Sequence, residues 1–184
     1  MVGYILLGYL LAFGTKTVGY SRTTMTLVIV FAGALWLAAT VAAGAWSDRV
    51  GRKPVYLVGY LLILAVSIPF FLLLEARNLA LVYLATAIVS AGLGLTYGAQ
   101  SALYAELFPA HVRYSGASFA YALGAIVGGG FAPFIADLLL QKTGTSMSIA
   151  AYMMTVAAVS LLATWAIRKT DLNGFGDDRS PAQQ

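Results

Sequence analysis

Six long apolar runs, separated by short polar segments, restrict the folds open to this sequence. They occupy residues 1–15, 24–46, 54–74, 79–104, 114–140 and 146–167. A helix needs about 20 apolar residues to cross roughly 30 Å of hydrocarbon, and five of the runs reach that length. With 60% hydrophobic and only 10% charged residues, the chain has too little polar surface for a soluble domain. We therefore predict an all-α integral membrane protein with six transmembrane helices.

The first and last segments differ from the rest. At 1.5 Å per residue the first run extends only about 22 Å, less than a full span, and Met1 stands at its edge. We predict that this helix is truncated, and a short helix in a thinned bilayer is the alternative. Residues 168–184 are polar and are predicted to form a disordered cytoplasmic tail. Residues 1–167 then make one transmembrane domain.

The segment from Gly44 to Lys53 joins the second and third runs and marks one membrane face. It reads GAWSDRVGRK, and its three basic residues predict a cytoplasmic loop. Gly51 permits a tight turn, because glycine adopts backbone angles that other residues avoid. Gly44 lets a neighbouring helix approach closely. Asp48, at a helix end, can accept hydrogen bonds from a facing helix. A solvated loop that only follows the topology rule is the alternative.

The distribution of basic residues predicts the topology. Six spans place both termini on the same side, and the Asp48 loop assigns that side to the cytoplasm. The cytoplasmic group would hold Arg49, Arg52, Lys53, Arg113, Arg168, Lys169 and Arg179. The opposite face would hold Lys16, Arg22, Arg77 and Lys142.

A second polar segment lies between the fourth and fifth runs, on the same predicted face. Pro109 ends helical geometry there. Glu106 and Arg113 flank the turn, and we expect them to pair with each other or with Arg49 and Asp48 across the bundle. Interfacial charges that simply reach for water are the alternative.

These segments carry a family resemblance. The spacing G-x-x-x-D-R-x-G-R-K, filled by Gly44, Asp48, Arg49, Gly51, Arg52 and Lys53, resembles the signature loop of the major facilitator superfamily of secondary transporters. The strings AELFP-x-x-VRYSGAS and GAI-x-GGG-x-AP-x-IA are similar to its metabolite:proton symporter branch, which carries shikimate-like acids, di- and tricarboxylates, or betaine-type osmolytes.

The resemblance implies a fold and a mechanism. It implies the C-terminal half of a twelve-helix fold in a bacterial inner membrane, partnered by an N-terminal six-helix half or a second copy of the chain. It implies alternating access that carries a small metabolite together with protons, while the Asp48 loop, Glu106 and Arg113 act at the inner gate. A truncated membrane protein that does not transport, or a packing subunit, is the alternative.

Polar residues within the spans indicate where a solute could bind. Carriers of this kind bind solute near the bilayer midplane, and polar groups there are costly enough to mark function. Tyr97, Gln100 and Ser101 share one face of the fourth span, and Ser118 and Tyr121 lie on the fifth. We expect Tyr97, Gln100, Ser101 and Tyr121 to contact the solute. Helix–helix hydrogen bonds without a ligand are the alternative.

The fifth span has three further features. Gly124 and Gly128 have the small-xxx-small spacing of closely packed membrane helices. Pro133 is expected to bend the helix. Asp137 is the only carboxylate inside a predicted span, and we expect it at the outer interface, paired with Lys142. A residue that carries protons or acts at a gate is the alternative.

The residue inventory argues against other classes of protein. The chain has no cysteine and a single histidine, His111, so we predict no metal site. It places no convergent acid, base and nucleophile at depth, so we predict neither an enzyme nor a cofactor. The net charge of +4 comes mainly from helix ends and the tail, and we predict no nucleic-acid partner.

Overall fold

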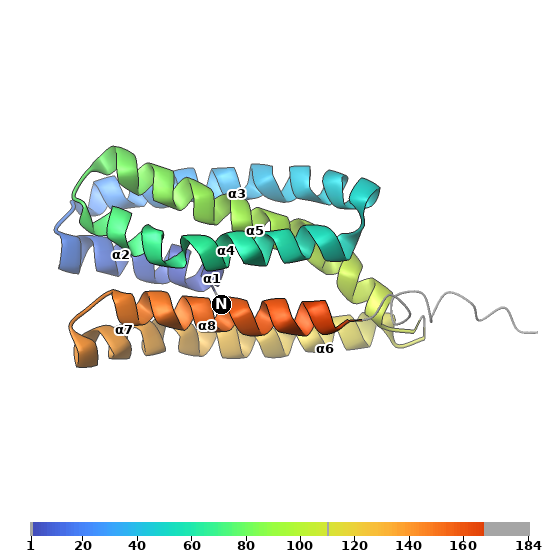
Figure 1. Ribbon diagram of the computed structural model, residues 1–184. Coiled ribbons are helices and arrows are strands. Elements are labelled where there is room, and N and C mark those ends of the chain that lie inside the picture. Colours follow the sequence, from blue (N-terminus) through green and yellow to red (C-terminus); the bar gives the residue numbers. More distant parts are fainter. Residues whose placement is uncertain (1, 110, 168–184) are drawn as a thin grey trace, which may run out of the picture.

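The computed structural model describes residues 2–109 and 111–167. Over these residues the chain is a bundle of antiparallel helices (Figure 1), and the described part contains no strand. Met1, Ala110 and the predicted tail at 168–184 lie outside the described residues.

The six predicted helices are all present. The first, Val2–Val18, alternates α1 (Val2–Tyr4), η1 (Ile5–Tyr9), α2 (Leu10–Phe13) and η2 (Gly14–Val18), where η denotes a π-helical segment. It is followed by α3 (Arg22–Val50), α4 (Arg52–Glu75) and α5 (Leu79–Leu107), then by the composite α6 (Arg113–Ala125), η3 (Ile126–Gly130) and α7 (Phe131–Thr143), and by α8 (Met147–Ala166). In the described part, five helices are long and apolar enough to cross a membrane, and Val2–Val18 is shorter.

The predicted ten-residue loop is in fact a one-residue turn. Helix α3 continues to Val50 and α4 begins at Arg52, so only Gly51 leaves helical geometry. Long charged side chains reach water from the last helical turn, so the backbone can stay helical while the charges leave the hydrocarbon. Gly51 has φ 102° and ψ 153°, a conformation open essentially to glycine, and its N–H donates to the Ser47 carbonyl at 2.9 Å.

The fifth helix departs from α geometry about one turn before the predicted bend. The widened segment is η3, Ile126–Gly130, rather than Pro133 itself. Proline lacks an N–H, so the carbonyl one turn earlier loses its partner, and a π turn is one way to accommodate this. Of the two glycines in the predicted packing pattern, Gly128 is buried, whereas a Cβ on Gly124 would meet nothing within 4 Å. A Cβ on Gly129 would lie 3.0 Å from the Tyr4 ring.

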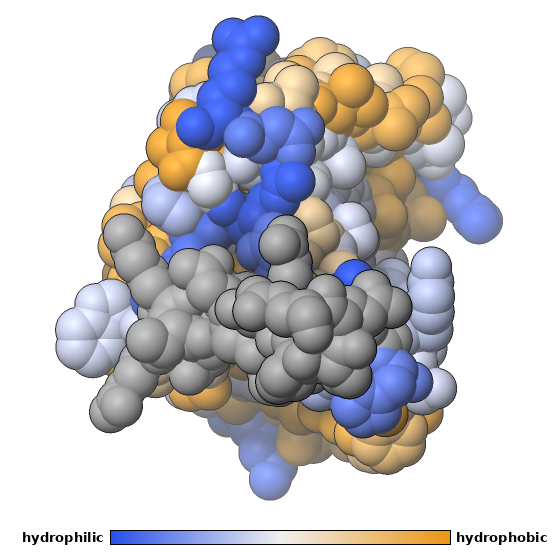
Figure 2. All heavy atoms as spheres, turned by 90° about the vertical axis from the view of Figure 1, so that its right-hand side faces the viewer, coloured by the Kyte–Doolittle hydropathy of each residue, from blue (hydrophilic) through white to orange (hydrophobic). Residues whose placement is uncertain are grey.

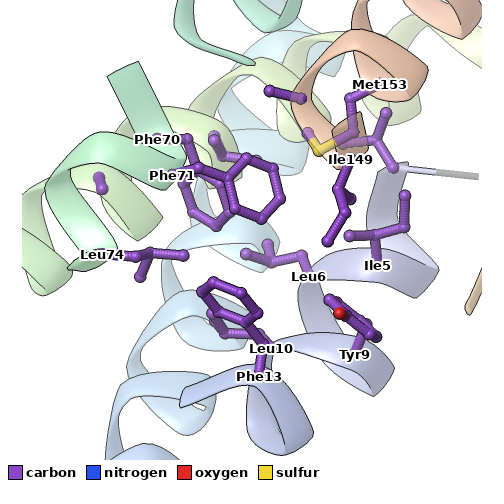
Figure 3. Close-up of a cluster of buried hydrophobic side chains, with 14 of the residues drawn as sticks. Ile5, Leu6, Tyr9, Leu10, Phe13, Phe70, Phe71, Leu74, Ile149 and Met153 are labelled. Atoms are coloured by element: carbon purple, nitrogen blue, oxygen red, sulfur yellow. The ribbon is translucent and has the colours of Figure 1, made fainter. Parts of the chain in front are cut away.

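The main apolar core lies toward the end of the bundle away from Gly51. It joins the first helix, α4 and α8 (Figure 3). Phe71 packs edge-on against Phe13, with centroids 5.7 Å apart, and against Phe70 at 5.1 Å. Leu6 and Met153 close the cluster and are almost fully buried. Three helices that are distant in sequence are thereby held together.

Small residues bring α3 and α5 into backbone contact. A Cβ on Gly94 would lie 2.3 Å from the Ala39 Cβ, and a Cβ on Gly98 would lie 2.5 Å from the Thr40 carbonyl oxygen and 2.7 Å from the Gly44 nitrogen. Such spacing lets membrane helices gain dispersion contacts without a hydrophobic driving force. The close helix approach predicted at Gly44 is therefore present, and its partner is α5.

Candidate functional site

Charged side chains meet where α3, α4 and α5 converge. Figure 2 views this end of the bundle and shows a band of hydrophilic side chains on the part that is not drawn in grey, with apolar surface on the flanks. Arg52 donates to the Asp48 carboxylate and, at 2.9 Å, to the Ser47 hydroxyl. Its Nε lies 3.6 Å from Glu106 Oε1. One guanidinium thus links three helices.

The members of this charge network differ from those predicted. Glu106 pairs with Arg52, while Arg49 and Arg113 take part in no ion pair within the described residues. Glu106 lies in the last turn of α5, beside the start of α4, whereas Arg113 follows the break at Pro109 and opens α6. The Arg113 Nε is buried and has no hydrogen-bond partner in the described part of the chain.

Lys53 makes a contact that sequence reasoning missed. Its Nζ donates to the carbonyl oxygens of Trp165, at 2.9 Å, and Ile167. The last carbonyls of a helix lack intrahelical partners and carry the negative end of its dipole, so a lysine there is favourable. The contact joins the start of α4 to the end of α8. A side chain that bonds a backbone more than a hundred residues away leaves no local signal in the sequence.

A cavity of about 350 Å³ opens between α5 and α6. Its lining residues are Tyr97, Gln100, Ser101, Tyr104, Ala117, Ser118 and Tyr121. All four residues predicted to contact solute line this one cavity. Sequence reasoning missed Tyr104, although it stands one turn beyond Gln100 and continues the same polar face.

A second cavity of about 340 Å³ shares a wall with the first. The shared wall consists of Tyr97, Gln100, Tyr104 and Tyr121, and further phenols come from Tyr4, Tyr56 and Tyr60. Tyr97 is near enough to Tyr121, Tyr4 and Tyr60 for their phenols to interact electrostatically. The i, i+4 spacing of Tyr56 and Tyr60 on an apolar helix is a signal that could have identified both in advance.

The side chains of the shared wall are partly exposed on the lateral surface of the helix bundle. Tyr97 is 38% exposed and Tyr121 49% exposed. Gln100 lies six residues before Glu106, and hence about 9 Å from that charged end. Polar groups at such depth are costly to expose to lipid. The wall therefore suits a space filled with water or covered by protein.

Asp137 lies outside these cavities. Its Oδ2 accepts a hydrogen bond from Gln141 Nε2 at 2.6 Å, near the end of α7. The predicted partner Lys142 takes part in no ion pair among the described residues, because a residue five positions on points away from the shared helix face. The described residues also contain no group of three or more side chains suited to hold a metal ion.

The helical bundle and its polar wall are features of a membrane carrier half, and sequence comparison supplies the family. The model of the Major Facilitator Superfamily matches residues 1–173, so the chain belongs to this superfamily. Its relatives are transporters rather than enzymes. The chain is an integral membrane protein of a transport family.

Three similar proteins give the range of known relatives. The chain is 32% identical to the shikimate transporter of Escherichia coli over 162 residues, 86% of this chain and 37% of that protein. It is 32% identical to the ectoine/proline transporter ProP of Corynebacterium glutamicum over 161 residues, 86% of this chain and 31% of that protein. It is 34% identical to the citrate-proton symporter of Klebsiella pneumoniae over 165 residues, 88% of this chain and 36% of that protein.

The chain spans about a third of the length of these relatives. No solved structure matches it.

Proposed function

We propose that this chain is the C-terminal six-helix half of a bacterial inner-membrane carrier. The carrier moves a small polar metabolite, of the organic acid or osmolyte class, by alternating access and in symport with protons. Both termini of the half face the cytoplasm. An N-terminal six-helix half, or a second copy of the chain, completes the solute path.

The observation that carries this proposal is the polar wall between α5 and α6. Tyr97, Gln100 and Tyr121 line one cavity from two helices and remain partly exposed at membrane depth. A second half packed over this wall would enclose the cavity and remove the cost of exposing polar groups to lipid. This geometry supports a solute site whose other side comes from a second half.

The charged end supports a gate. Arg52 links Asp48 on α3 to Glu106 on α5, so the ends of three helices are held together by pairs that water can compete for. These ion pairs stabilise one conformation and break when this half tilts relative to the other half. Asp48→Asn is expected to change the transport rate while membrane insertion persists. Unchanged transport with normal insertion would remove Asp48 from the gate.

The test uses the native protein extracted from its own membrane. Because the chain spans about a third of its relatives, we expect an intact mass roughly two to three times 19.4 kDa. Proteoliposomes of that protein should take up solute in a saturable manner, faster with an inward proton gradient. A single copy of the 184-residue chain should give no saturable uptake. Robust uptake by a single copy would contradict the half-carrier, whereas uptake by a dimer alone would identify the second copy as the other half. A native mass of 19.4 kDa without uptake would instead support a packing subunit.

A further inference from the structure

The shared wall and the two cavities that it separates contain no charged side chain among the described residues. In the described part of the chain, neither cavity is lined by an aspartate, glutamate, lysine, arginine or histidine. A carboxylate moved from water into such a site without a cationic partner bears a large desolvation cost. This half therefore offers little to a solute that carries two or three carboxylates.

What the wall does offer is aromatic rings and neutral hydrogen-bonding groups. Tyr97, Tyr104 and Tyr121 line the cavity between α5 and α6, together with the amide of Gln100. Phenol faces attract cations through the ring quadrupole, and the attraction strengthens when water is excluded. Trp36 packs edge-on against Tyr97, with centroids 5.0 Å apart, and so helps to fix that ring.

The cation that precedes the cavity-lining residues on α6 is Arg113. Arg113 precedes Ala117 by one turn of α6, about 6 Å along the helix axis. Its Nε has no hydrogen-bond partner among the described residues. The Glu106 carboxylate, which was expected to pair with Arg113, is paired with Arg52 instead. A single uncommitted guanidinium can balance a single carboxylate.

Resting on the proposed function, we propose that this wall recognises zwitterionic solutes, with a methylated or ring ammonium against the tyrosines and one carboxylate toward Arg113. A methylated ammonium is weakly hydrated for a cation, so it loses little on leaving water and gains the phenol faces. The cavity volume of about 350 Å³ accommodates a small solute of this kind. Tricarboxylates are rejected because the wall provides no charges to balance them.

Two ligands of the same shape test the proposal on the unaltered native protein. N,N,N-trimethylglycine and 3,3-dimethylbutanoate share a carboxylate and a branched head, and they differ in one central atom that is N⁺ or C. Calorimetric titration of the native protein in nanodiscs should give roughly tenfold or greater preference for the ammonium ligand. Equal affinity, preference for the uncharged head, or tighter binding of citrate would overturn the proposal.

Variants locate the preference within the wall. Tyr121→Phe keeps the ring and should keep the preference, whereas Tyr121→Leu should lose most of it. Tyr114→Leu is the matched control, because Tyr114 lies on the same helix, is 87% exposed and does not line the cavity. Arg113→Gln should lower the binding affinity for both ligands by a similar factor, since both carry the carboxylate. Preference retained in a folded Tyr121→Leu variant would contradict the assignment.

The titration also separates the two proposals, because binding does not require transport. Selective binding without uptake would contradict only the carrier function. Proton-dependent uptake by a protein that prefers the uncharged head would contradict only the zwitterion assignment.

Discussion

The two ends of the bundle are built from different interactions. Toward the end of α4, the aromatic rings of Phe13, Phe70 and Phe71 interlock with side chains from the first helix and α8. Toward the start of α4, the buried apolar cluster is small and the helices are joined by Arg52 and Lys53. Interlocked rings hold their partners through many contacts, whereas a few charged contacts at a water-facing end can break and re-form. In the proposed carrier, the aromatic end keeps its packing while the charged end opens.

The largest expected effect comes from the close contact between α3 and α5 at Gly94. Gly94→Val forces side-chain atoms into Ala39, 2.3 Å from the position of the new Cβ. We expect a loss of about 3 kcal/mol or more in the free energy of unfolding, because two backbones must separate. Thermal unfolding in detergent, followed by tryptophan fluorescence, measures it. Gly33→Val is the control, since a Cβ at Gly33 would meet nothing within 4 Å. Equal loss in both variants would contradict this packing.

The aromatic end should respond to loss of a ring. Phe71→Ala is expected to cost about 2 kcal/mol, below the usual range for buried phenylalanine, since lipid removes much of the hydrophobic term and leaves the cavity term. Leu72→Ala is the neighbouring control, and its side chain is 54% exposed. The same unfolding assay applies to both. A larger loss for Leu72→Ala would place the core on the wrong face of α4.

The charged end should lose little stability and gain mobility. Arg52→Gln removes the link between Asp48 and Glu106, and we expect it to cost at most about 1 kcal/mol. Amide hydrogen exchange near the end of α5 should become faster. Arg49→Gln serves as the control, because Arg49 takes part in no ion pair among the described residues. Unchanged exchange in Arg52→Gln would show that the pairs do not hold the end closed.

The smallest expected effect is local to the end of α8. Lys53→Met frees the carbonyls of Trp165 and Ile167, so the last turn should fray. We expect roughly two- to fivefold faster amide exchange there, from the loss of one helix-end cation. Lys142→Met changes a lysine in the last turn of another helix, α7, and should leave the end of α8 unaffected. Exchange as slow as in the unaltered protein would contradict the contact.

Much of the fold could be predicted because a helix needs about 20 apolar residues to cross the hydrocarbon of a bilayer. The apolar runs predicted six helices, and Pro109 correctly separated α5 from α6. The helix ends were less predictable, since charged residues such as Asp48 and Arg49 remain helical while their side chains reach water. The widened turn at Ile126–Gly130 was missed because it depends on how three glycines respond to Pro133, and on no pattern of hydrophobicity.

The candidate site was predictable where it followed helix periodicity. Tyr97, Gln100 and Ser101 share a face by spacing alone, and the structure sets them opposite Tyr121. Pairing between charges was not predictable, because the choice of Arg52 over Arg113 as the partner of Glu106 depends on how the helix ends meet. The roles of these residues in solute binding and gating remain predictions.

The most direct test of the central claim asks whether water reaches the wall between α5 and α6. These 184 residues contain no cysteine, so an introduced cysteine is the single one within this half, and labelling of the unaltered native protein measures any background from the rest. Ser118 lines the cavity, whereas the adjacent Phe119 is 67% exposed and does not line it. In the native protein in its membrane, Ser118→Cys should react with a water-soluble maleimide and be protected by transported solute, and Phe119→Cys should stay unreactive because thiolates form only in contact with water. Equal reactivity at both positions, or none at Ser118→Cys, would contradict a solute path along this wall.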